Sequence, residues 1–587
     1  MERISLVRDG MRIEYNVPIP MEDGAYCMSN IYFPLEQGVY PVVLSYGCYG
    51  KDLAFQDHYP EQWAQMISEH PEVGANSSCI HMTWETVDPE KWCCDGYICL
   101  RVDSRGAGCT PGYMDPFSSR ETRDIYNCIE WAAAQPWCNG KVGMNGISYF
   151  AVNQWQAAEL QPPHLAAICV WEGNCDYYRE LTHQGGILCV SQEKWQYNQG
   201  NPIQYGLGDR GYKSRVTGLN CSGDETMCER ELMANRCDMS QDIFEHPLYD
   251  DYYRDRNVGD FSKIKTPLLS AGNWGGQGLH LRGNVEGFLR AGSEEKWLEI
   301  HGDEHWTRFY CDDGIALQKQ FFGYYLKGEE NGWRERRRCS LKIRHVDGTY
   351  QERWEDAWPI ERTRYEKLYL SPDCTLGACP PEGEGVLTYN GLGDGVTFLT
   401  GPLERETELT GHSMVKLFVS SSTSDADLFV VLRVFAPDMQ EITFSGANEP
   451  YCPIAQGWLR ASHRKKDPVL STDYRPYYTH DELWPLTPGE VVELDVDFYP
   501  TCLVVPAGYR IGLTVRGKDY VYPGTPREKL ALHNTRRPGG TVYKAGCGGL
   551  HHDDERDRPA AVFGGDVTLH FGAQAPAYLQ LPVIPKE

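Results

Sequence analysis

The sequence predicts a doubly wound α/β domain with a cap insertion, followed by an all-β domain, and three observations support this. From residue 26 to about 180, short apolar runs alternate with helical patterns, which is the βαβ rhythm of a parallel sheet. Residues 181–258 break this rhythm with polar, Gly-rich and acidic segments. After about residue 345 the chain is β-rich, with Gly, Pro and Asp turns and no intervening helices.

These observations divide the chain into four segments. Residues 1–180 and 259–345 are expected to form the α/β domain, and residues 181–258 a helical cap over its sheet. Residues 346–587 are expected to form a β jelly roll. A length of 587 residues agrees with several domains, because single domains commonly span about 100 to 200 residues.

Charge and hydropathy exclude several classes of protein. A formal net charge of -26 repels a phosphate backbone, and basic runs such as the Arg336 to Arg338 cluster are short, so nucleic acid is not expected as a partner. The N-terminus lacks the apolar core of a secretion signal, and no apolar stretch of about 18 residues occurs. We expect a cytoplasmic protein that does not enter a membrane, and a homo-oligomer is compatible with the sequence.

The 22 cysteines are scattered through predicted strands and helices, without a secretion signal. We therefore expect them to be mostly reduced and buried. Since paired C-x-x-C spacing is missing, we expect no metal and no cofactor. The run "HHDDERD" at 551–557 is compatible with a cation site, but a solvated loop is the favoured interpretation.

Local patterns in the first segment place its elements. "YPVVLSYG" and "GYICLRVDSRG" are typical of strands, and "SSRETRDIYNCIEWAAAQPW" of a helix. Ser118 and Glu121 have the spacing of a capping box. One face of this helix is expected to be apolar and to carry Ile125, Cys128, Ile129, Ala132 and Ala133.

"GMNGISYFAVNQW" places Ser148 between a short strand and a helix that starts near Tyr149. This is the setting of a nucleophile elbow, in which a strained turn presents a serine hydroxyl above the sheet. The G-x-S-x-G pattern is incomplete, because Phe150 stands at the position of the second glycine. Most G-x-S triplets are ordinary turns, so the motif needs support from the rest of the chain.

That support comes from a resemblance over nearly the whole chain. The matching segments are "VPIPMEDG", "SYGCYGKD", "LRVDSRGAGCTPG", "GISYFAVNQWQAA", "PLLSAGNW", "SDADLFVVLRVFAPD" and "GWLRASHR". Through them the chain resembles the CocE/NonD hydrolases, which include cocaine esterase, α-amino-acid ester hydrolases and X-Pro dipeptidyl-peptidases. The family elbow is G-x-S-Y-x-G, so Gly146, Ser148 and Tyr149 match, while Ala151 replaces the last glycine. The resemblance implies an α/β-hydrolase fold and a serine nucleophile.

The same resemblance implies an oxyanion hole. In such enzymes a tyrosine after an early strand donates its hydroxyl, and Tyr49 matches it; the N–H of Tyr149 would be the second donor. A packing role for the Tyr49 ring is the alternative. Asp103 and Arg105 match the family's D-x-R-G motif, where a structural ion pair is expected.

The family histidine lies five residues beyond its strand, which in "WLEIHGDEHW" corresponds to His305. Its imidazole would accept the Ser148 proton and return it to the leaving group. His301, at the strand end, and His280 are the alternatives.

The family acid is missing from its usual place, because "AGNWGGQG" has Gly275 and Gly276 there and these glycines are expected to leave space beside the histidine. The carboxyl ends of parallel strands open to one crevice, so an acid on the neighbouring strand could replace it. In "LAAICVWEGNCDYY" the first carboxylate after the apolar run is Glu172. We therefore predict a Glu172 oxygen within hydrogen-bond reach of His305 Nδ1. A helix cap or a pair with Arg179 is the alternative role for Glu172.

Three other carboxylates are weaker candidates for the acid. Asp176 follows Glu172 in the same segment, and Asp303 and Glu304 lie next to the histidine, where their side chains rarely reach Nδ1.

Together these features predict a serine hydrolase that cleaves an ester or amide of a small acyl substrate through an acyl-enzyme. An X-Pro dipeptidyl-peptidase is less favoured, because the chain begins almost at once with the catalytic domain. The rival from another class is a ligand-binding protein with a decayed triad. Substrate-binding residues are unknown, although Trp195, Tyr197 and Tyr205 suggest an aromatic pocket in the cap.

Overall fold

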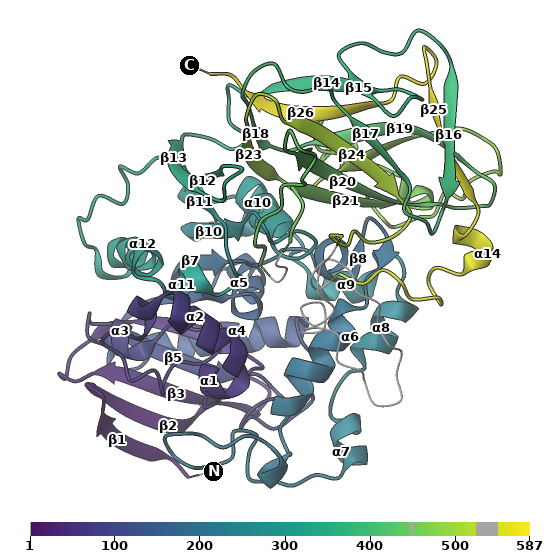
Figure 1. Cartoon of the computed structure of the whole chain (residues 1–587). Coiled ribbons are helices and arrows are strands. Elements are labelled where there is room, and N and C mark those ends of the chain that lie inside the picture. The colour runs from purple at the N-terminus through teal and green to yellow at the C-terminus, as the bar shows by residue number, and fades with distance from the viewer. Residues whose placement is uncertain (1, 448–450, 524–549, 587) are drawn as a thin grey trace.

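The computed structural model describes residues 2–447, 451–523 and 550–586. A mixed sheet with helices on its faces forms the N-terminal part, and a separate β domain forms the C-terminal part (Figure 1). The short helices of the cap are inserted within the N-terminal part of the chain, and the cap contacts both parts.

The first sheet has eleven strands in the order β1-β2-β3-β5-β4-β6-β7-β10-β11-β12-β13. Their bounds are β1 Ile4–Arg8, β2 Met11–Pro20, β3 Tyr26–Pro34, β4 Tyr40–Gly47, β5 Ile98–Asp103, β6 Cys138–Ile147, β7 Leu165–Trp171, β10 Leu268–Asn273, β11 Lys296–His301, β12 Cys339–Arg344 and β13 Tyr350–Glu355. Strands β5 to β12 in this order are parallel, as the alternating pattern predicts.

The edges of this sheet differ from the prediction. β3 pairs antiparallel with both β2 and β5, so the parallel set starts at β4 and not at residue 26. At the other edge β13 pairs antiparallel with β12, so the sheet continues past residue 345. The pattern of apolar runs does not reveal strand direction, which depends on the connections between strands.

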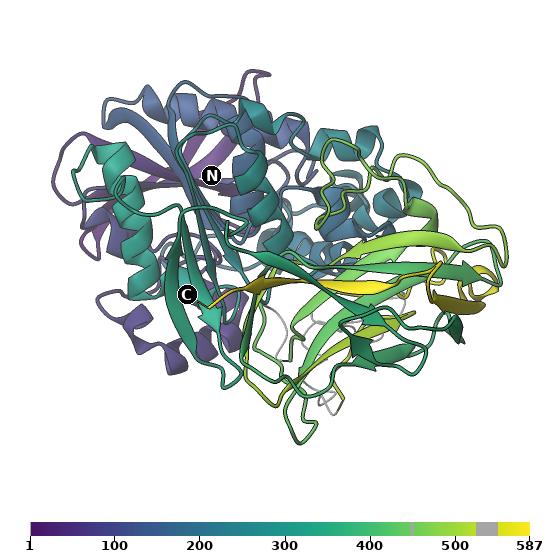
Figure 2. The same ribbon diagram turned by 90° about the horizontal axis from the view of Figure 1, so that it is seen from above.

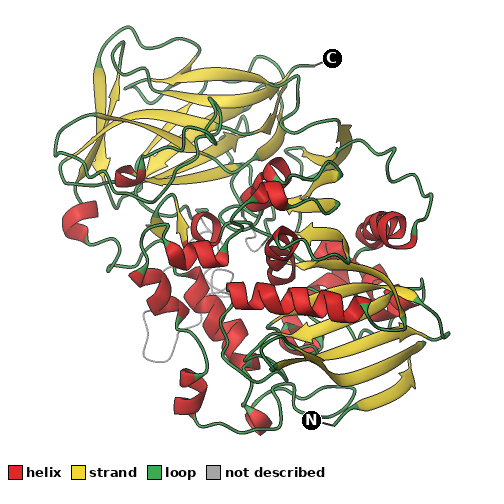
Figure 3. Cartoon of the chain, turned by 180° about the vertical axis from the view of Figure 1, so that it is seen from behind, coloured by secondary structure: helices red, strands yellow, loops and turns green. Residues whose placement is uncertain are grey.

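Helices cover both faces of the parallel strands (Figure 3). They are α1 Phe55–His58, α2 Pro60–Glu69, α3 Pro89–Cys93, α4 Ser119–Ala133, α5 Tyr149–Glu159, α10 Leu281–Arg290, α11 Thr307–Tyr310 and α12 Asp312–Phe322. Because both faces are covered, a central strand such as β4 is buried along almost its whole length.

Helix α4 begins where predicted, but its capping box is wrong. The Ser118 hydroxyl donates to the Asp115 carbonyl, 2.8 Å away, and makes no bond to the helix N–H groups. The Glu121 carboxylate instead accepts from the Phe117 N–H at 2.8 Å and from the Tyr149 hydroxyl. Glu121 therefore connects α4 to the first residue of α5. The predicted face is confirmed: Ile125, Cys128, Ile129 and Ala132 are buried, and Ala133 is partly buried beside them.

The cap consists of short elements. They are β8 His183–Gln184, β9 Ile187–Leu188, α6 Ser191–Trp195, α7 Glu229–Ala234, α8 Met239–Glu245 and α9 Asp251–Arg256. The N–H of Gly108, in the α/β domain, donates to the Ile203 carbonyl at 2.8 Å, and the Arg460 N–H of the β domain donates to the Gly185 carbonyl at 2.8 Å. The cap is thus bonded to both domains.

The C-terminal domain, seen from above in Figure 2, is built of β-sheets. It contains a nine-stranded and a four-stranded sheet with a shared apolar core. Its strands are β14 Arg364–Leu370, β15 Leu376–Gly377, β16 Gly385–Asn390, β17 Val396–Leu399, β18 Thr407–Gly411, β19 Met414–Ser421, β20 Asp427–Phe435, β21 Ala455–Arg460, β22 Val492–Asp497, β23 Thr501–Val505, β24 Arg510–Arg516, β25 Asp566–Phe571 and β26 Tyr578–Ile584. One short helix, α14 Ala560–Phe563, precedes β25.

The described cysteines are free thiols, and most of them are buried. This confirms the expectation of small apolar residues without disulfides. No helix in the described ranges is long and apolar enough to cross a lipid bilayer.

Candidate active site

Ser148 lies in the tight turn between β6 and α5 and has a φ of 53° and a ψ of -114°. This strained, left-handed backbone is typical of a nucleophile elbow. The Ser148 N–H donates to the carbonyls of Trp171 and Glu172, at 3.1 and 3.2 Å, which ties the turn to the end of β7. A Cβ on Gly146 would lie 2.4 Å from the Phe150 Cβ, so this position requires glycine.

The replacement of the last elbow glycine by Ala151 is accommodated by the neighbouring strand. A Cβ on Gly173 would lie 2.6 Å from the Ala151 Cβ. Gly173 thus provides the space that the Ala151 methyl group occupies. The departure from the family motif leaves the turn intact.

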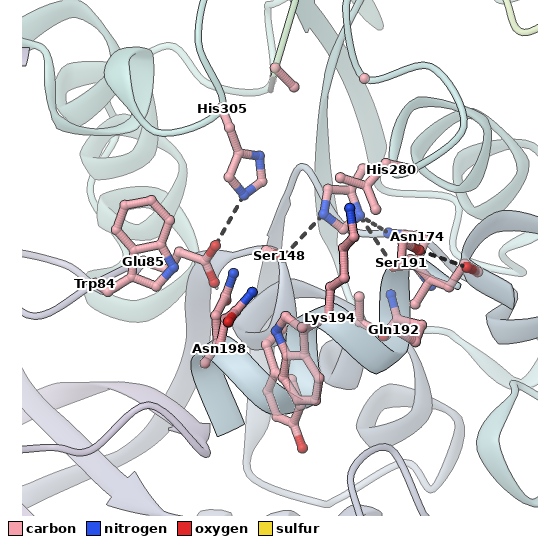
Figure 4. Close-up of a pocket in the computed structure, with 18 of the residues that line it drawn as sticks. Trp84, Glu85, Ser148, Asn174, Ser191, Gln192, Lys194, Asn198, His280 and His305 are labelled. Carbon is pink, nitrogen blue, oxygen red and sulfur yellow. Dashed lines mark hydrogen bonds and ion pairs between the residues drawn. The ribbon is translucent and has the colours of Figure 1, made fainter. Parts of the chain in front are cut away.

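Ser148 lies on the wall of a cavity of about 620 Å³. Figure 4 shows Glu85 and His305 on one side of the serine and His280 on another. The lining includes aromatic residues from both the α/β domain and the cap: Tyr49, Tyr59, Trp84, Phe117, Tyr149 and Trp195. Of the three aromatic residues suggested for the cap, Trp195 lines the cavity, whereas Tyr197 and Tyr205 do not.

Glu172 follows β7 and is completely buried. Its Oε2 lies 2.7 Å from His305 Nδ1, within the predicted range. Its Oε1 accepts from His301 Nε2 at 3.0 Å and from Asn273 Nδ2 at 3.1 Å. Burial opposes the charged form, but His305 and His301 outweigh it and lower the pKa of Glu172 to about 2. Glu172 is therefore an ionised carboxylate with both oxygens in use.

The loop after β10 differs from the prediction that Gly275 and Gly276 leave space beside the histidine. A Cβ on Gly275 would lie 2.3 Å from the Gly446 Cα, and on Gly276 3.1 Å from the Asn273 carbonyl oxygen. The backbone of the β domain fills the place of a side chain at Gly275. A carboxylate at Gly275 would thus displace the β domain, which agrees with an acid on the neighbouring strand.

His305 bridges two carboxylates. Besides Glu172 on Nδ1, its Nε2 lies 3.0 Å from Glu85 Oε1. Burial disfavours the imidazolium, but Glu172 and Glu85 outweigh it and raise the pKa of His305 to about 10. At neutral pH both ring nitrogens of His305 are therefore protonated in this arrangement.

The histidine that contacts Ser148 is His280, one of the two alternatives, and not His305. Ser148 Oγ lies 3.1 Å from His280 Nε2. The His280 and His305 rings are stacked, with their centroids 5.3 Å apart. Burial and repulsion by His305 lower the pKa of His280 to about 3, so this ring is neutral at neutral pH.

The tautomer of His280 follows from its other nitrogen. The backbone N–H of Asn174 donates to His280 Nδ1 at 3.2 Å. Because a backbone N–H can only donate, Nδ1 is an acceptor there and the ring proton lies on Nε2. His280 then donates to Ser148 Oγ, which is the wrong direction for removing the serine proton. Asn174 Oδ1 also lies 3.2 Å from Nδ1, and in the amide orientation that places the NH₂ group there, both Asn174 contacts donate to this nitrogen.

The two predicted oxyanion donors are near the elbow. The Tyr49 oxygen accepts from Trp195 Nε1 at 2.8 Å, so its own O–H is available for donation. Burial raises the pKa of Tyr49 well above its usual value, which keeps this hydroxyl protonated. Tyr149 is the first residue of α5, where backbone N–H groups have no partner within the helix.

Other candidate residues have structural roles. Asp103 and Arg105 do not pair with each other: Asp103 accepts from the backbone N–H groups of Lys51 and Cys109, at 2.6 and 2.7 Å, and Arg105 pairs with Asp124 at 2.6 Å. Asp103 thus holds together the two loops that carry Lys51 and Cys109.

The remaining carboxylates do not contact His305 Nδ1. Asp176 pairs with Arg179 at 2.6 Å, which leaves Glu172 free of Arg179. Asp303 accepts from the Tyr350 hydroxyl at 3.4 Å, and Glu304 accepts from Ser445 at 3.1 Å.

The run at 551–557 is not the solvated loop expected from its charge. His551 and His552 are buried, and His552 Nδ1 lies 2.8 Å from Asp519 Oδ1. Within the described ranges, potential metal ligands gather in two other places: His70 with Glu72 and Cys311, and Asp9 with His81 and Glu90. None of these six residues lines the Ser148 cavity.

Sequence reasoning missed Glu85, Asn174 and Asn273. Asn273 ends β10, a strand whose neighbours carry catalytic candidates, so its position in the sheet was a usable signal. Glu85 lies in a long connection between β4 and β5 and carries no motif. Its place beside His305 depends on the tertiary fold.

Comparison with known proteins identifies the family of this chain. Residues 23–307 match the model of the X-Pro dipeptidyl-peptidase (S15) family, and residues 331–580 match the X-Pro dipeptidyl-peptidase C-terminal non-catalytic domain. Cocaine esterase from Rhodococcus sp. is 23% identical over 584 residues, covering 88% of this chain and 92% of the esterase.

Solved structures include similar folds. An aminopeptidase from a marine sediment archaeon has a TM-score of 0.65 at 16% identity, covering 100% of this chain and 96% of that one, which shows likeness of fold. A CocE/NonD family hydrolase from Staphylococcus aureus has a TM-score of 0.82 at 30% identity, covering 100% of this chain and 96% of that one. The chain is thus a serine hydrolase and belongs to the CocE/NonD family of hydrolases.

Proposed function

We propose that this serine hydrolase cleaves esters or amides of small acyl substrates through an acyl-enzyme on Ser148. The observation that carries the proposal is the strained Ser148 turn on the wall of a cavity of about 620 Å³. A cavity of this size suits a small organic substrate. The serine oxygen would attack the substrate carbonyl, and water would later hydrolyse the acyl-enzyme.

In this proposal His305 is the general base and Glu172 orients it. His305 has a buried carboxylate 2.7 Å from Nδ1, the partner that a catalytic imidazole needs to stabilise its charged form. His280 faces a backbone N–H on that nitrogen instead. We assign His280 the role of donating a hydrogen bond to Ser148 Oγ. This bond holds the hydroxyl in place until His305 takes its proton.

Tyr49 and the Tyr149 N–H would stabilise the developing oxyanion. Both belong to residues that line the cavity beside Ser148. The proposal leaves the choice between ester and amide, and the acyl and leaving groups, to experiment.

The test is covalent labelling followed by a substrate panel. A fluorophosphonate probe should label the wild-type protein at Ser148 and fail to label Ser148→Ala. A panel of p-nitrophenyl esters and p-nitroanilides, with and without X-Pro dipeptide acyl groups, would then define the substrate class. Persistent labelling of Ser148→Ala would contradict the assignment of the nucleophile.

Three further predictions from the sequence belong to this proposal. We propose a jelly roll for the C-terminal domain, supported by its two sheets with a shared core. A cytoplasmic location and a homo-oligomeric state stay predictions. Cell fractionation and sedimentation would test them.

A further inference from the structure

Glu85 contacts His305 Nε2, the nitrogen that would accept the proton of Ser148 in the proposed function. His305 Nε2 lies 3.0 Å from Glu85 Oε1, while Nδ1 lies 2.7 Å from Glu172 Oε2 (Figure 4). Ionised carboxylates only accept hydrogen bonds, so each ring nitrogen must donate a proton. A base in this state cannot accept the proton of Ser148.

The backbone fixes Glu85 in this place. The Glu85 carbonyl accepts from the Ile147 N–H at 3.0 Å, one residue before the nucleophile. Its φ is 62°, an uncommon value for a residue with a side chain, and Glu85 is only 2% exposed. The segment carrying Glu85 is thus bonded to the strand that carries Ser148.

The two carboxylates on His305 are held differently. Glu172 has partners on both oxygens, His305 on one and His301 with Asn273 on the other. In the described part of the chain, Glu85 Oε2 has no hydrogen-bond partner. Burial raises the pKa of Glu85, against the opposing effect of His305. Glu85 is therefore the carboxylate that can take up a proton and turn away.

We propose that Glu85 is a positioning residue that keeps His305 Nε2 from Ser148 at rest, and that opening of this contact precedes acylation. The proposal rests on the proposed function, in which His305 is the base. The Nε2–H bond of His305 breaks and an O–H bond forms on Glu85 Oε1, which leaves both groups neutral. The Nδ1 proton stays on His305 and donates to Glu172.

Rotation of the neutral Glu85 carboxyl then frees the Nε2 lone pair. As Ser148 Oγ attacks the substrate carbonyl, its proton moves to this lone pair. The imidazolium so formed later gives the proton to the leaving group. No oxidant, metal or further reactant is needed, because the step moves one proton between two residues.

The proposal predicts a specific change in pH dependence. The charged and titratable groups that face His305 are Glu172, Glu85 and, across the ring stack, His280. In the wild-type protein Glu85 keeps the proton that His305 gives up, so the resting and the active arrangement hold the same number of protons. A glutamine cannot take that proton, which must then pass to solvent, so the acidic limb of the kcat/KM profile should follow His305 itself and move to higher pH.

The experiment is the pH profile of kcat/KM for an activated ester with wild-type protein and Glu85→Gln. We expect the acidic limb of the variant to move up by at least about one pH unit, which lowers kcat/KM at a pH on that limb about ten-fold relative to the plateau. Glu85→Ala should shift in the same direction and serves as the second variant if Gln disturbs folding. Glu304→Gln is the matched control, because Glu304 adjoins His305 in sequence but contacts Ser445.

An acidic limb that stays in place in both Glu85 variants, whatever happens to kcat, would overturn the proposal. Fluorophosphonate labelling of His305→Gln separates this failure from failure of the proposed function. If His305→Gln still reacts at the wild-type rate, His305 is not the base and the proposed function itself is wrong. If His305→Gln is unreactive but the limb does not move, only the role of Glu85 is wrong.

Discussion

The loop after β10 and the loop after β11 each bring one histidine to the Ser148 cavity, and the two rings are stacked 5.3 Å apart. His280 meets a backbone N–H on Nδ1, and His305 meets a carboxylate there. The first ring is neutral and the second is an imidazolium, with pKa values of about 3 and about 10. In the proposed mechanism the partner of Nδ1, and not proximity to the serine, distinguishes the base.

Removal of the Ser148 hydroxyl should have the largest effect on kcat. Ser148→Ala should lower kcat for activated esters by about 10⁶-fold, the order seen when the nucleophile of subtilisin is removed. Steady-state kinetics on a p-nitrophenyl ester would measure this, with circular dichroism as the control for folding. Turnover near the wild-type rate would exclude Ser148 as the nucleophile.

Removal of the charge that distinguishes the two histidines should come next. Glu172→Gln keeps the shape of the side chain but removes the carboxylate from His305 Nδ1. A comparable aspartate-to-asparagine change in chymotrypsin lowers kcat about 10⁴-fold, and we expect a loss of this order. The measurement is kcat, with the fluorophosphonate labelling rate beside it. A loss in kcat below ten-fold would contradict the claim that the Glu172 carboxylate distinguishes His305 as the base.

A change that touches neither histidine should cost less. Tyr49→Phe removes one proposed oxyanion donor and should lower kcat by about 10² to 10³, or about 3 to 4 kcal/mol of transition-state stabilisation. KM should change less than kcat. An effect on KM alone would make Tyr49 a binding residue.

The smallest effect is expected from Asp303, which precedes His305 in the same loop. Among the described residues, the Asp303 side chain accepts from the Tyr350 hydroxyl alone, at 3.4 Å, and does not contact His305 Nδ1. Asp303→Asn should therefore change kcat by less than about two-fold, because exposed polar contacts contribute little. A large loss in kcat would show that Asp303 contributes to catalysis.

Parallel-strand geometry explains why the contact between Glu172 and His305 could be predicted. The ends of neighbouring parallel strands open to the same crevice, so a carboxylate after β7 lies near a loop after β11. The elbow at Ser148 was predictable for a similar reason, because Gly146 and the strand-to-helix transition are local features. Alternating apolar runs likewise indicated the parallel centre of the sheet.

The rest depended on contacts that no local pattern records. The space expected at Gly275 is filled by Gly446, which lies far along the chain in the β domain. Glu85 reaches His305 from a connection without a motif, and His280 contacts both Ser148 and Asn174, which lie in two other loops. Strand directions at the sheet edges depend on chain connections in the same way.

The rate of fluorophosphonate inactivation in His280→Gln and His305→Gln tests the central claim most directly, because the probe reports the nucleophilicity of Ser148 without substrate turnover. If the partner on Nδ1 defines the base, His305→Gln should react at least about 10³-fold more slowly than wild type, while His280→Gln should stay within about ten-fold. The reverse order, with His280→Gln unreactive and His305→Gln close to wild type, would contradict the account and make His280 the base.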